Sequence, residues 1–368
     1  MKNTQRYLAL DVLRGLTIAT MITVNNPGSW RYIYPPLEHS KWNGCTPTDL
    51  VFPFFLFVVG VSMFFSFSKY NNTLNRDSLL RIGKRTLLIF LIGLFLNSFP
   101  QWLTNYSTLR ILGVLQRIAL AYGIGAIIVL SVKPKLLPYI CGGILLVYWG
   151  LIWFLGGPDP YSLQGNITSV FDSAILGTAH MYTGFGIPFD PEGFFSTIPA
   201  IGTVIIGYQT GKLIRSTNRD VLPLKLLSWG VAAVIAGYAW GQLFPINKPI
   251  WSSSYVLYSA GWAMLVLSLF IWLIDIKEWK GWTKPFVVFG MNPLFLFAFA
   301  GIWAKTLTRI KIGADPQYAT SLYNWIYETI FAPIGGNTFG SLLFALTHIV
   351  IFWFIGYILY KKNIFIKV

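Results

Sequence analysis

Charged residues are scarce in this chain of 368 residues, where Asp, Glu, Lys and Arg together make up 11%. A soluble domain carries about 25%, so the deficit argues against an ordinary soluble protein. Acidic residues are the scarcest, which leaves a net charge of +15. That charge alone could indicate nucleic-acid binding, but most of the basic residues lie in the loops between apolar runs. We therefore expect no nucleic-acid partner.

Cysteine and histidine are also few. Cys45 and Cys141 are the two cysteines, and two cysteines support neither a disulfide framework nor a metal site built on thiolates. The three histidines, His39, His180 and His348, lack the H-x-x-x-H and H-E-x-x-H spacings of zinc sites. Walker A and Rossmann glycine patterns are absent as well. The sequence predicts no metal and no nucleotide-binding fold.

Long apolar runs are abundant instead. About 20 mostly apolar residues span a bilayer as a helix, and we identify ten candidates. They are residues 8–24, 50–68, 83–98, 111–131, 136–155, 196–213, 222–244, 254–274, 284–304 and 339–360. No stretch is left over for a sizeable soluble domain. We predict an all-α polytopic membrane protein in which residues 1–368 form a single transmembrane domain of about ten helices.

The basic residues set the expected orientation. Nineteen Lys and Arg residues lie in the terminal segments and the loops on the same side, against seven in the alternate loops. The positive-inside rule therefore places both termini in the cytoplasm. The longer outer segments, 25–49, 156–195 and 305–338, are rich in aromatic residues and are expected to form a cap. The first apolar run contains Asp11 and Arg14, so we interpret it as a membrane helix rather than a removable signal peptide.

Charges inside apolar runs need a reason, because each costs at least about 2.5–3.5 kcal/mol on insertion scales. Asp11 and Arg14 share a helix face. They are either a mutually neutralising pair, or Arg14 faces an anionic ligand from the cytoplasm. Arg117 lies two turns deeper than Arg110 and must face the bundle interior.

A basic strip lies at the predicted inner mouth. It consists of Arg76, Arg81, Lys84 and Arg85. One interpretation is topogenic charge with lipid headgroup contacts. The other is a site for the phosphates of a cofactor, since Lys and Arg are natural phosphate partners.

His39 lies just before the apolar run 50–68, in the stretch LEHSKWNGCTPTDL. An unperturbed histidine accepts a proton near neutral pH. Asp49 or Glu38 could orient its ring, and the amides of Asn25, Asn26 and Asn43 could stabilise an oxyanion. Spacing alone favours a structural role for His39 over this catalytic one. His348 is expected in the core, and His180 is either structural or in contact with substrate.

Several blocks of this sequence resemble the heparan-α-glucosaminide N-acetyltransferase family. They are VNN followed by EHSKWNGCTPTDLVFPFFLFVVG, then LRILGVLQRIALAY, FDPEGFFSTIPAIGTVIIGYQTGK, INKPIWSSSYVLYS, FGMNPL and YILYKKNIFIKV. The blocks occur in the family's order through nearly the whole chain. The sequence looks like a bacterial relative without the extra N-terminal portion of the animal lysosomal members.

The resemblance implies a transmembrane acyltransferase that takes acetyl-CoA from the cytoplasm. It would acetylate the amine of a glucosamine-type sugar on the periplasmic side of a bacterial inner membrane, where the cap and the active-site loop would lie. The family's active-site histidine falls on His39 and its preceding asparagine on Asn25. With Asp49 as the orienting carboxylate, these are the expected catalytic residues.

The remaining expected site residues follow from the same scheme. Those expected to hold the cofactor are Arg14, Arg76, Arg81, Lys84, Arg85 and Arg117. Those expected to contact the sugar are His180, Asp190, Glu192, Asn247, Lys248, Trp251 and Asn292.

Other functions remain open at this stage. They are acylation of sugar hydroxyls by the same base, and transport or flipping of sugars. Direct transfer and an acetyl-His intermediate need the same residues, and we favour direct transfer. Membrane lipid is an expected partner, and a homodimer is compatible with the resemblance.

Overall fold

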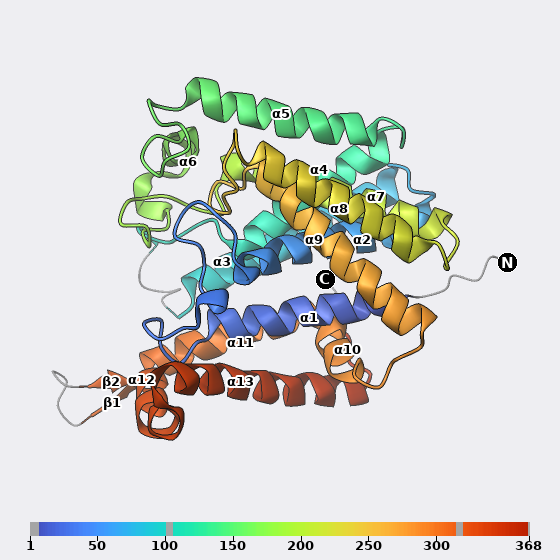
Figure 1. The fold of residues 1–368 in the computed structure, drawn as a ribbon. Helices are drawn as coiled ribbons and strands as arrows, with labels where there is room; N and C mark the ends of the chain where they lie inside the picture. Colours follow the sequence, from blue (N-terminus) through green and yellow to red (C-terminus); the bar gives the residue numbers. More distant parts are fainter. Residues whose placement is uncertain (1–6, 101–105, 314–318, 367–368) are drawn as a thin grey trace. The chain divides into compact units, whose positions relative to one another are not determined.

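The computed structural model describes residues 7–100, 106–313 and 319–366. Almost all regular structure is helical (Figure 1). The two described strands, β1 (Lys311–Ile312) and β2 (Thr320–Ser321), form a small antiparallel pair. The predicted all-α class is confirmed.

The chain folds into two compact units. Among the described residues, unit 1 contains 7–39, 46–51, 279–313 and 319–366, and unit 2 contains 40–45, 52–100 and 106–278. The single-domain assignment made from the sequence stays a prediction.

Unit 1 is built around α1 (Leu8–Asn25), which packs against α10, α11 and α13. Its helices after α1 are η1 (Pro35–Leu37), η2 (Pro47–Leu50), α10 (Lys284–Met291), α11 (Pro293–Arg309), α12 (Leu322–Ile326), η6 (Tyr327–Phe331) and α13 (Ala332–Lys361). Buried aromatic rings of Tyr323, Tyr327 and Phe344 form its core at the α12 end. His348 is buried beside Phe344, as the sequence indicated.

Unit 2 consists of longer helices. They are α2 (Val51–Phe67), whose first residue belongs to unit 1, then η3 (Ser68–Tyr70), α3 (Arg76–Ser98), α4 (Val114–Ser131), α5 (Leu137–Leu155), α6 (Ile167–Leu176), η4 (Thr178–His180), α7 (Phe194–Ser216), α8 (Leu222–Trp240), α9 (Ser253–Phe270) and η5 (Ile271–Ile276). The helix pairs α3–α4 and α8–α9 pack along their lengths, and α7 contacts α4, α5 and α9. Where α2 meets α7, a Cβ on Gly60 would lie 2.2 Å from the carbonyl oxygen of Val204. Glycine therefore permits this close contact between helices, as in other membrane bundles.

Seven helices among the described residues are long and apolar enough to cross a membrane, and α10 with α11 forms a pair bent by 83° that would make an eighth. Each of the ten expected runs falls largely on a helix or on this bent pair, and the number that cross the membrane stays a prediction. The helix α3 carries too many charged residues at its start to be counted with these seven. The helix α7 is too polar to be counted with them. A polytopic helical membrane protein is the class that these helices define.

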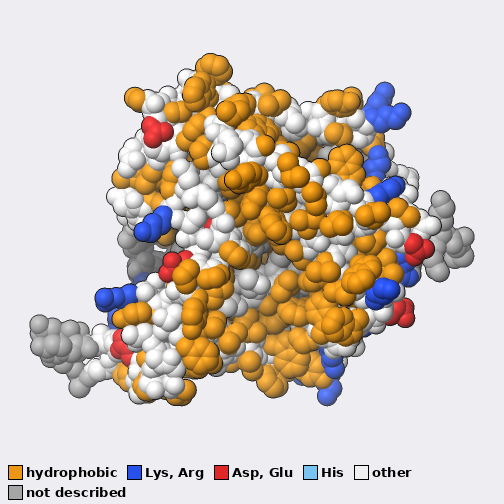
Figure 2. Space-filling model, in the orientation of Figure 1, with side chains coloured by type: hydrophobic (Ala, Val, Ile, Leu, Met, Phe, Trp, Pro, Cys, Tyr) orange, Lys and Arg blue, Asp and Glu red, His pale blue; other side chains and the backbone are white. Residues whose placement is uncertain are grey.

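The surface fits a membrane environment. Hydrophobic side chains cover most of the face in Figure 2, and Lys and Arg gather near the edges of that view. Exposed apolar side chains on α5 include Leu146, Val147 and Phe154, the last of which is 83% exposed. Such exposure is costly in water, whereas in a bilayer it is expected.

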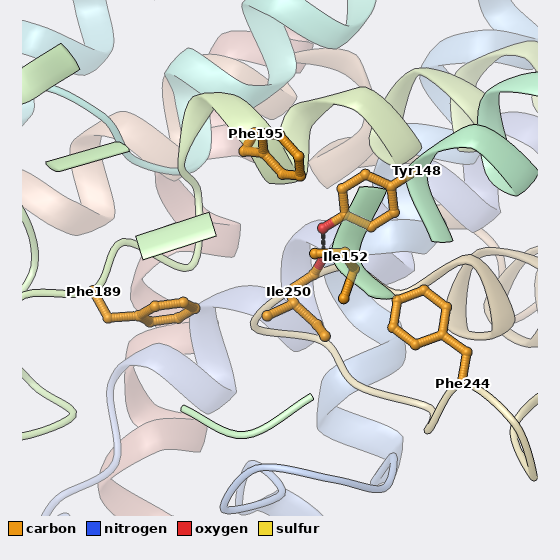
Figure 3. Close-up of a cluster of buried hydrophobic side chains, with 6 residues drawn as sticks. All are labelled: Tyr148, Ile152, Phe189, Phe195, Phe244 and Ile250. Carbon is orange, nitrogen blue, oxygen red and sulfur yellow. Dashed lines mark hydrogen bonds between the residues drawn. The ribbon is translucent and has the colours of Figure 1, made fainter. Parts of the chain in front are cut away.

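A second apolar core lies in unit 2 and holds loops in place. Tyr148 and Ile152 of α5 pack with Phe189, Phe195, Phe244 and Ile250 (Figure 3). The Tyr148 hydroxyl donates to the carbonyl oxygen of Ile250 at 2.5 Å. Trp42 packs against this cluster and donates its Nε1–H to the carbonyl oxygen of Tyr161 at 2.8 Å. Four segments that are distant in sequence are joined here, which supports residues 40–45.

Candidate active site

His39 and Asp49 form a hydrogen-bonded pair in unit 1. Nδ1 of His39 lies 2.7 Å from Oδ1 of Asp49. The histidine side chain is 43% exposed, whereas that of Asp49 is 1% exposed. Of the two carboxylates that could orient this ring, Asp49 makes the contact. The pair thus has a buried anchor and an accessible ring.

The other oxygen of Asp49 is used to start a helix. Thr46 is the N-cap of η2, and its backbone N–H and hydroxyl both lie 3.1 Å from Oδ2 of Asp49. The backbone N–H of Asp49 donates back to the carbonyl oxygen of Thr46 at 3.0 Å, and the two residues form a capping box. The Thr46 hydroxyl also lies 2.6 Å from the carbonyl oxygen of Glu38. The residue before His39 is therefore held by the same cap.

This arrangement decides which ring nitrogen can act as a base. An ionised carboxylate only accepts hydrogen bonds, so Nδ1 of His39 is the donor to Asp49. In the neutral ring the lone pair then lies on Nε2. A carboxylate at a helix N-terminus is also favoured in its charged form. The pair has the geometry of a histidine general base and its orienting carboxylate.

Asn25 is the last residue of α1, and its side chain is exposed. Its neighbour Asn26 is buried and donates its Nδ2–H to the carbonyl oxygen of Ile22 at 2.8 Å. Of the two amides in the VNN block, Asn26 is therefore occupied in ending the helix. Asn25 keeps an amide that a ligand can reach.

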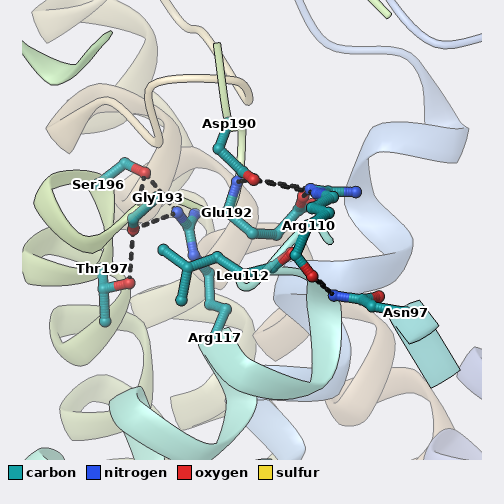
Figure 4. Close-up of polar contacts among 9 residues, drawn as sticks. All are labelled: Asn97, Arg110, Leu112, Arg117, Asp190, Glu192, Gly193, Ser196 and Thr197. Carbon is teal, nitrogen blue, oxygen red and sulfur yellow. Dashed lines mark hydrogen bonds and ion pairs between the residues drawn. The ribbon is translucent and has the colours of Figure 1, made fainter. Parts of the chain in front are cut away.

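Two predicted sugar-contacting acids are joined to a cation in unit 2 (Figure 4). Asp190 accepts two hydrogen bonds from Arg110, at 3.0 Å to Nε and 2.7 Å to Nη2. Glu192 accepts a third at 2.6 Å. Burial raises the pKa of Asp190, and the hydrogen bond and charge of Arg110 oppose that shift. Burial by itself would lower the pKa of Arg110, but its two carboxylate partners raise it above the usual range.

Arg117 is completely buried in unit 2, as its position in an apolar run required. Its Nη2 donates to the carbonyl oxygen of Gly193 at 3.2 Å and to the hydroxyl of Ser196. The guanidinium carbon lies 5.1 Å from the ring centroid of Trp251, another predicted site residue. Within the described part of the chain, Nε and Nη1 have no hydrogen-bond partner.

The loop with Asn247 and Lys248 contacts the segment that follows His39. The Asn247 side chain donates to Oδ1 of Asn43 at 3.1 Å and accepts the backbone N–H of Ile250 at 3.0 Å. The backbone N–H of Gly44 donates to the carbonyl oxygen of Ile246 at 2.7 Å. Asn247 is buried and Lys248 half-buried. Asn247 therefore orders the loop around residues 43–44.

The expected cofactor residues differ in what they contact. Arg76, Arg81 and Lys84 are exposed on α3, whereas the guanidinium of Arg85 lies 4.6 Å from the ring centroid of Tyr122. On α1, Arg14 lies 3.2 Å from Oδ1 of Asp11, which fits the neutralising pair. The three exposed cations are thus better placed to meet phosphates than Arg85.

Two further expected sugar contacts are engaged with the backbone. His180 has its Nδ1 2.8 Å from the carbonyl oxygen of Leu109. Asn292, at the bend between α10 and α11, donates to the carbonyl oxygen of Ile364 at 3.0 Å and accepts from the backbone N–H of Ile366 at 2.8 Å. Their expected contact with a sugar stays a prediction.

Sequence reasoning missed the role of Thr46 and the partner of Asn43. The role of Thr46 was readable, because T-P-T-D carries the spacing of a capping box. The pairing of Asn43 with Asn247 was not readable, because the two residues are 204 positions apart.

Comparison with known proteins identifies the family of this polytopic helical protein. Residues 6–244 match the family "Heparan-alpha-glucosaminide N-acetyltransferase, catalytic". The match includes His39, Asp49 and Arg117, and the chain belongs to this family. The resemblance of its sequence blocks is thereby confirmed.

Two curated relatives are similar over nearly the whole chain. Heparan-alpha-glucosaminide N-acetyltransferase of Homo sapiens is 26% identical over 426 residues, which cover 99% of this chain and 60% of that protein. The Mus musculus protein of the same name is 26% identical over 432 residues, covering 100% of this chain and 61% of that protein. The chain thus spans about three-fifths of the length of these relatives.

Proposed function

We propose that this protein is a transmembrane N-acetyltransferase that moves the acetyl group of acetyl-CoA to the amine of a glucosamine-type sugar. The observation that carries the proposal is the His39–Asp49 pair, with its buried carboxylate and accessible ring. Support comes also from membership of the acetyltransferase family over residues 6–244. The acceptor class is taken from the name of the relatives and belongs to the proposal.

His39 acts as the general base in this scheme. The neutral amine attacks the thioester carbonyl carbon, and Nε2 of His39 accepts the proton that the amine nitrogen loses. A C–N bond forms as the C–S bond breaks, and the proton passes from His39 to the departing sulfur. Asp49 stabilises the charged ring through Nδ1 while it holds the proton. Asn25 donates its amide N–H to the carbonyl oxygen as negative charge develops there.

The phosphates of CoA are assigned to the exposed cations of α3. Arg76, Arg81 and Lys84 supply the charge and the donors that phosphates require. These residues belong to the positively charged set of loops, so the positive-inside rule puts them in the cytoplasm. His39 then lies on the opposite, periplasmic side of a bacterial inner membrane. A homodimer and bound lipid remain predictions from the sequence.

The first test removes the base. Purified protein in lipid vesicles is given labelled acetyl-CoA and a panel of amino sugars, with His39→Ala beside wild type. General bases contribute about 10²–10⁴-fold, so we expect the turnover of His39→Ala to fall by that factor. Lys41→Ala, an exposed change in the same loop, should keep wild-type turnover.

Two outcomes would overturn the assignment. One is a wild-type protein that acetylates no amino sugar. The other is a His39→Ala protein as active as Lys41→Ala. Acetylated hydroxyls in place of acetylated amines would favour the related sugar O-acyltransferase, which needs the same base.

The second test concerns the cations of α3. The Arg81→Ala/Lys84→Ala double variant should raise the KM for acetyl-CoA by about a hundredfold or more, because charge-assisted contacts to phosphate contribute about 1.5–3 kcal/mol each and two are removed. The KM for the sugar should change less than twofold. The Lys133→Ala/Lys135→Ala variant removes the same charge from exposed positions after α4 and is the control. Equal KM values for acetyl-CoA in both double variants would show that the basic strip does not bind the phosphates. Its role would then be to set the membrane topology.

A further inference from the structure

An apolar groove of unit 2 lies between α3 and α4, and its volume is about 380 Å³. Large apolar side chains form its walls: Leu79, Leu87 and Phe90 from α3, and Leu120, Ile124 and Ile127 from α4. The walls face outward, since Leu87 is 59% exposed and Ile124 is 43% exposed. No residue of the groove belongs to the His39–Asp49 pair or to the Arg110 cluster, so neither of these sites explains it.

Two glycines shape the groove. A Cβ on Gly83 of α3 would meet no heavy atom within 4 Å, so the space in front of this residue is open. On α4, a Cβ on Gly123 would lie 2.6 Å from the hydroxyl oxygen of Thr86, which is the one polar side chain of the lining. The two helices therefore approach closely at Gly123, and Gly83 leaves a hollow beside that contact.

The length of the groove fits one acyl chain. From Leu79 to Phe90 the groove follows α3 for about 16 Å, at 1.5 Å per residue. The hydrocarbon of one leaflet is about 15 Å deep, half of a bilayer core of roughly 30 Å. The helix α4 is apolar enough to cross a membrane, and α3 packs along it. A hydrocarbon chain of one leaflet can therefore contact the groove over its whole length.

Cations gather at one end of the groove. The backbone N–H of Leu74 donates to the carbonyl oxygen of Leu130 at 3.0 Å, which joins the segment before α3 to the end of α4. Lys133 and Lys135 follow directly after α4, and both are exposed. Within the described residues, neither lysine is in an ion pair. The charge distribution predicts that this end faces the cytoplasm.

The charged residues of α3 differ in the side of the helix that they occupy. Arg76, the first residue of α3, precedes Leu79 by three positions and therefore lies on the groove side. With 3.6 residues per turn, Asp77, Arg81 and Lys84 lie roughly 120° or more around the helix from the groove. Arg81 and Lys84 thus stay with the set assigned to CoA. Arg76 belongs to that set too, so the test variants leave it unchanged.

We propose that the groove between α3 and α4 binds a glycerophospholipid with an anionic headgroup. One acyl chain lies against Leu87, Phe90 and Ile124, and the headgroup phosphate is held by Lys133 and Lys135. Basic positions between membrane helices on the cytoplasmic side are typical of such binding. The proposal does not depend on the acetyltransferase reaction, because none of these five residues is assigned to it.

The test measures lipid binding by native mass spectrometry. Intact protein in detergent is titrated with phosphatidylglycerol, which is anionic, or with phosphatidylcholine, which has no net charge, and both lipids carry the same acyl chains. Two lysines should favour phosphatidylglycerol about thirtyfold, which corresponds to about 2 kcal/mol. Equal affinities of the wild type for the two lipids would overturn the proposal.

A pair of double variants tests the headgroup contact. Lys133→Ala/Lys135→Ala should lose the preference and bind phosphatidylglycerol as weakly as phosphatidylcholine. Lys212→Ala/Lys225→Ala removes two exposed lysines of α7 and α8 in the same unit and should keep the preference. If the two double variants behave alike, the assignment of the headgroup to Lys133 and Lys135 is wrong.

A pair of glycine variants tests the acyl-chain contact. Gly83→Leu fills the groove and should weaken both lipids about tenfold, because the many small van der Waals contacts of the chain are lost. Gly143→Leu on α5 is the matched control, since a Cβ there also meets no heavy atom within 4 Å and the residue lies outside the groove. It should bind both lipids as the wild type does. Thermal midpoints without added lipid show that each variant is folded.

Two outcomes of the glycine variants would overturn the proposal. One is equal lipid binding by Gly83→Leu and Gly143→Leu. The other is a Gly83→Leu protein that dissociates from dimer to monomer while its lipid binding stays at the wild-type level. In that case a second copy of the chain, rather than a lipid, occupies the groove.

Discussion

The His39–Asp49 pair and the Arg110–Asp190–Glu192 cluster use carboxylates in different ways. In the cluster, Asp190 is fully buried, and Arg110 donates hydrogen bonds to both Asp190 and Glu192. In the pair, Asp49 is equally buried but divides its oxygens between His39 and the cap of a helix. The cluster holds segments together, whereas the pair leaves a titratable ring accessible. The first arrangement fits a structural role for the buried charge, and the second fits the base that we propose.

The largest effect expected from this contrast is on folding. Asp190→Ala leaves Arg110 without its main partner, and breaking a buried pair costs about 3–5 kcal/mol. The thermal midpoint of purified protein should fall sharply. Asp159→Ala, an exposed loop acid, should change stability by less than about 0.5 kcal/mol. Equal midpoints for the two variants would mean that the cluster does not hold the fold.

The next largest effect is expected at Asp49, where a substitution should raise the free energy of activation for catalysis by less than Asp190→Ala lowers the free energy of unfolding. Asp49→Asn retains an oxygen for the ring or for the cap but loses the charge that stabilises the protonated histidine. We expect kcat to fall about a hundredfold, which is part of the contribution of a general base, with both KM values unchanged. A purely structural role would instead lower the folded fraction and leave the turnover of the folded protein intact. Active-site titration beside thermal melting separates the two.

The carboxylate of Asp172 is intermediate between those of Asp190 and Asp49. Asp172 on α6 accepts the backbone N–H of Phe195 at 3.1 Å through Oδ1, while Oδ2 has no hydrogen-bond partner in the described chain. Burial raises its pKa to about 6 from 3.8, against the lowering effect of that hydrogen bond and of Arg117. The folded protein therefore binds a proton more strongly than the unfolded chain. Its stability is reduced as pH rises from about 4 through 6.

Asp172→Asn should consequently be more stable than wild type at pH 8, by about 3 kcal/mol, because each unit of pKa shift corresponds to about 1.4 kcal/mol. The advantage should shrink as pH falls through 6 and vanish below about pH 4, where Asp172 is protonated in both the folded protein and the unfolded chain. Thermal midpoints of both proteins across this range provide the measurement. Parallel curves would show that Asp172 does not titrate in the folded protein.

Much of the fold could be predicted, because apolar runs and charge placement report directly on helices in a membrane. The exact number of spans stays a prediction, and one bend was not predicted. The run 284–304 was expected as one helix, but Asn292 before Pro293 has a non-helical backbone (φ −129°, ψ 53°) and is hydrogen-bonded to the C-terminal segment, and the chain bends there by 83°. The residue before proline disfavours helix, so the dipeptide carried this signal.

The candidate site, like the fold, could be predicted only in part. His39, Asn25 and Asp49 were identifiable from family blocks, and the helix cap from T-P-T-D. The partner of Arg110 was not, because 80 positions separate it from Asp190. Pairing of segments that far apart depends on packing, which periodicity does not encode.

The divided carboxylate of Asp49 also limits how this protein can be re-engineered. One oxygen begins the helix that leads into α2 and the other orients His39. A designer who wishes to retune the base cannot exchange its partner freely, since each replacement must also serve as the third residue of a capping box. Among variants with other residues at position 49, we therefore expect few active proteins. Loss of expression and loss of activity should occur in the same variants. The nearby Lys41 has neither of these two roles, so it is the better position for attaching labels or tethers.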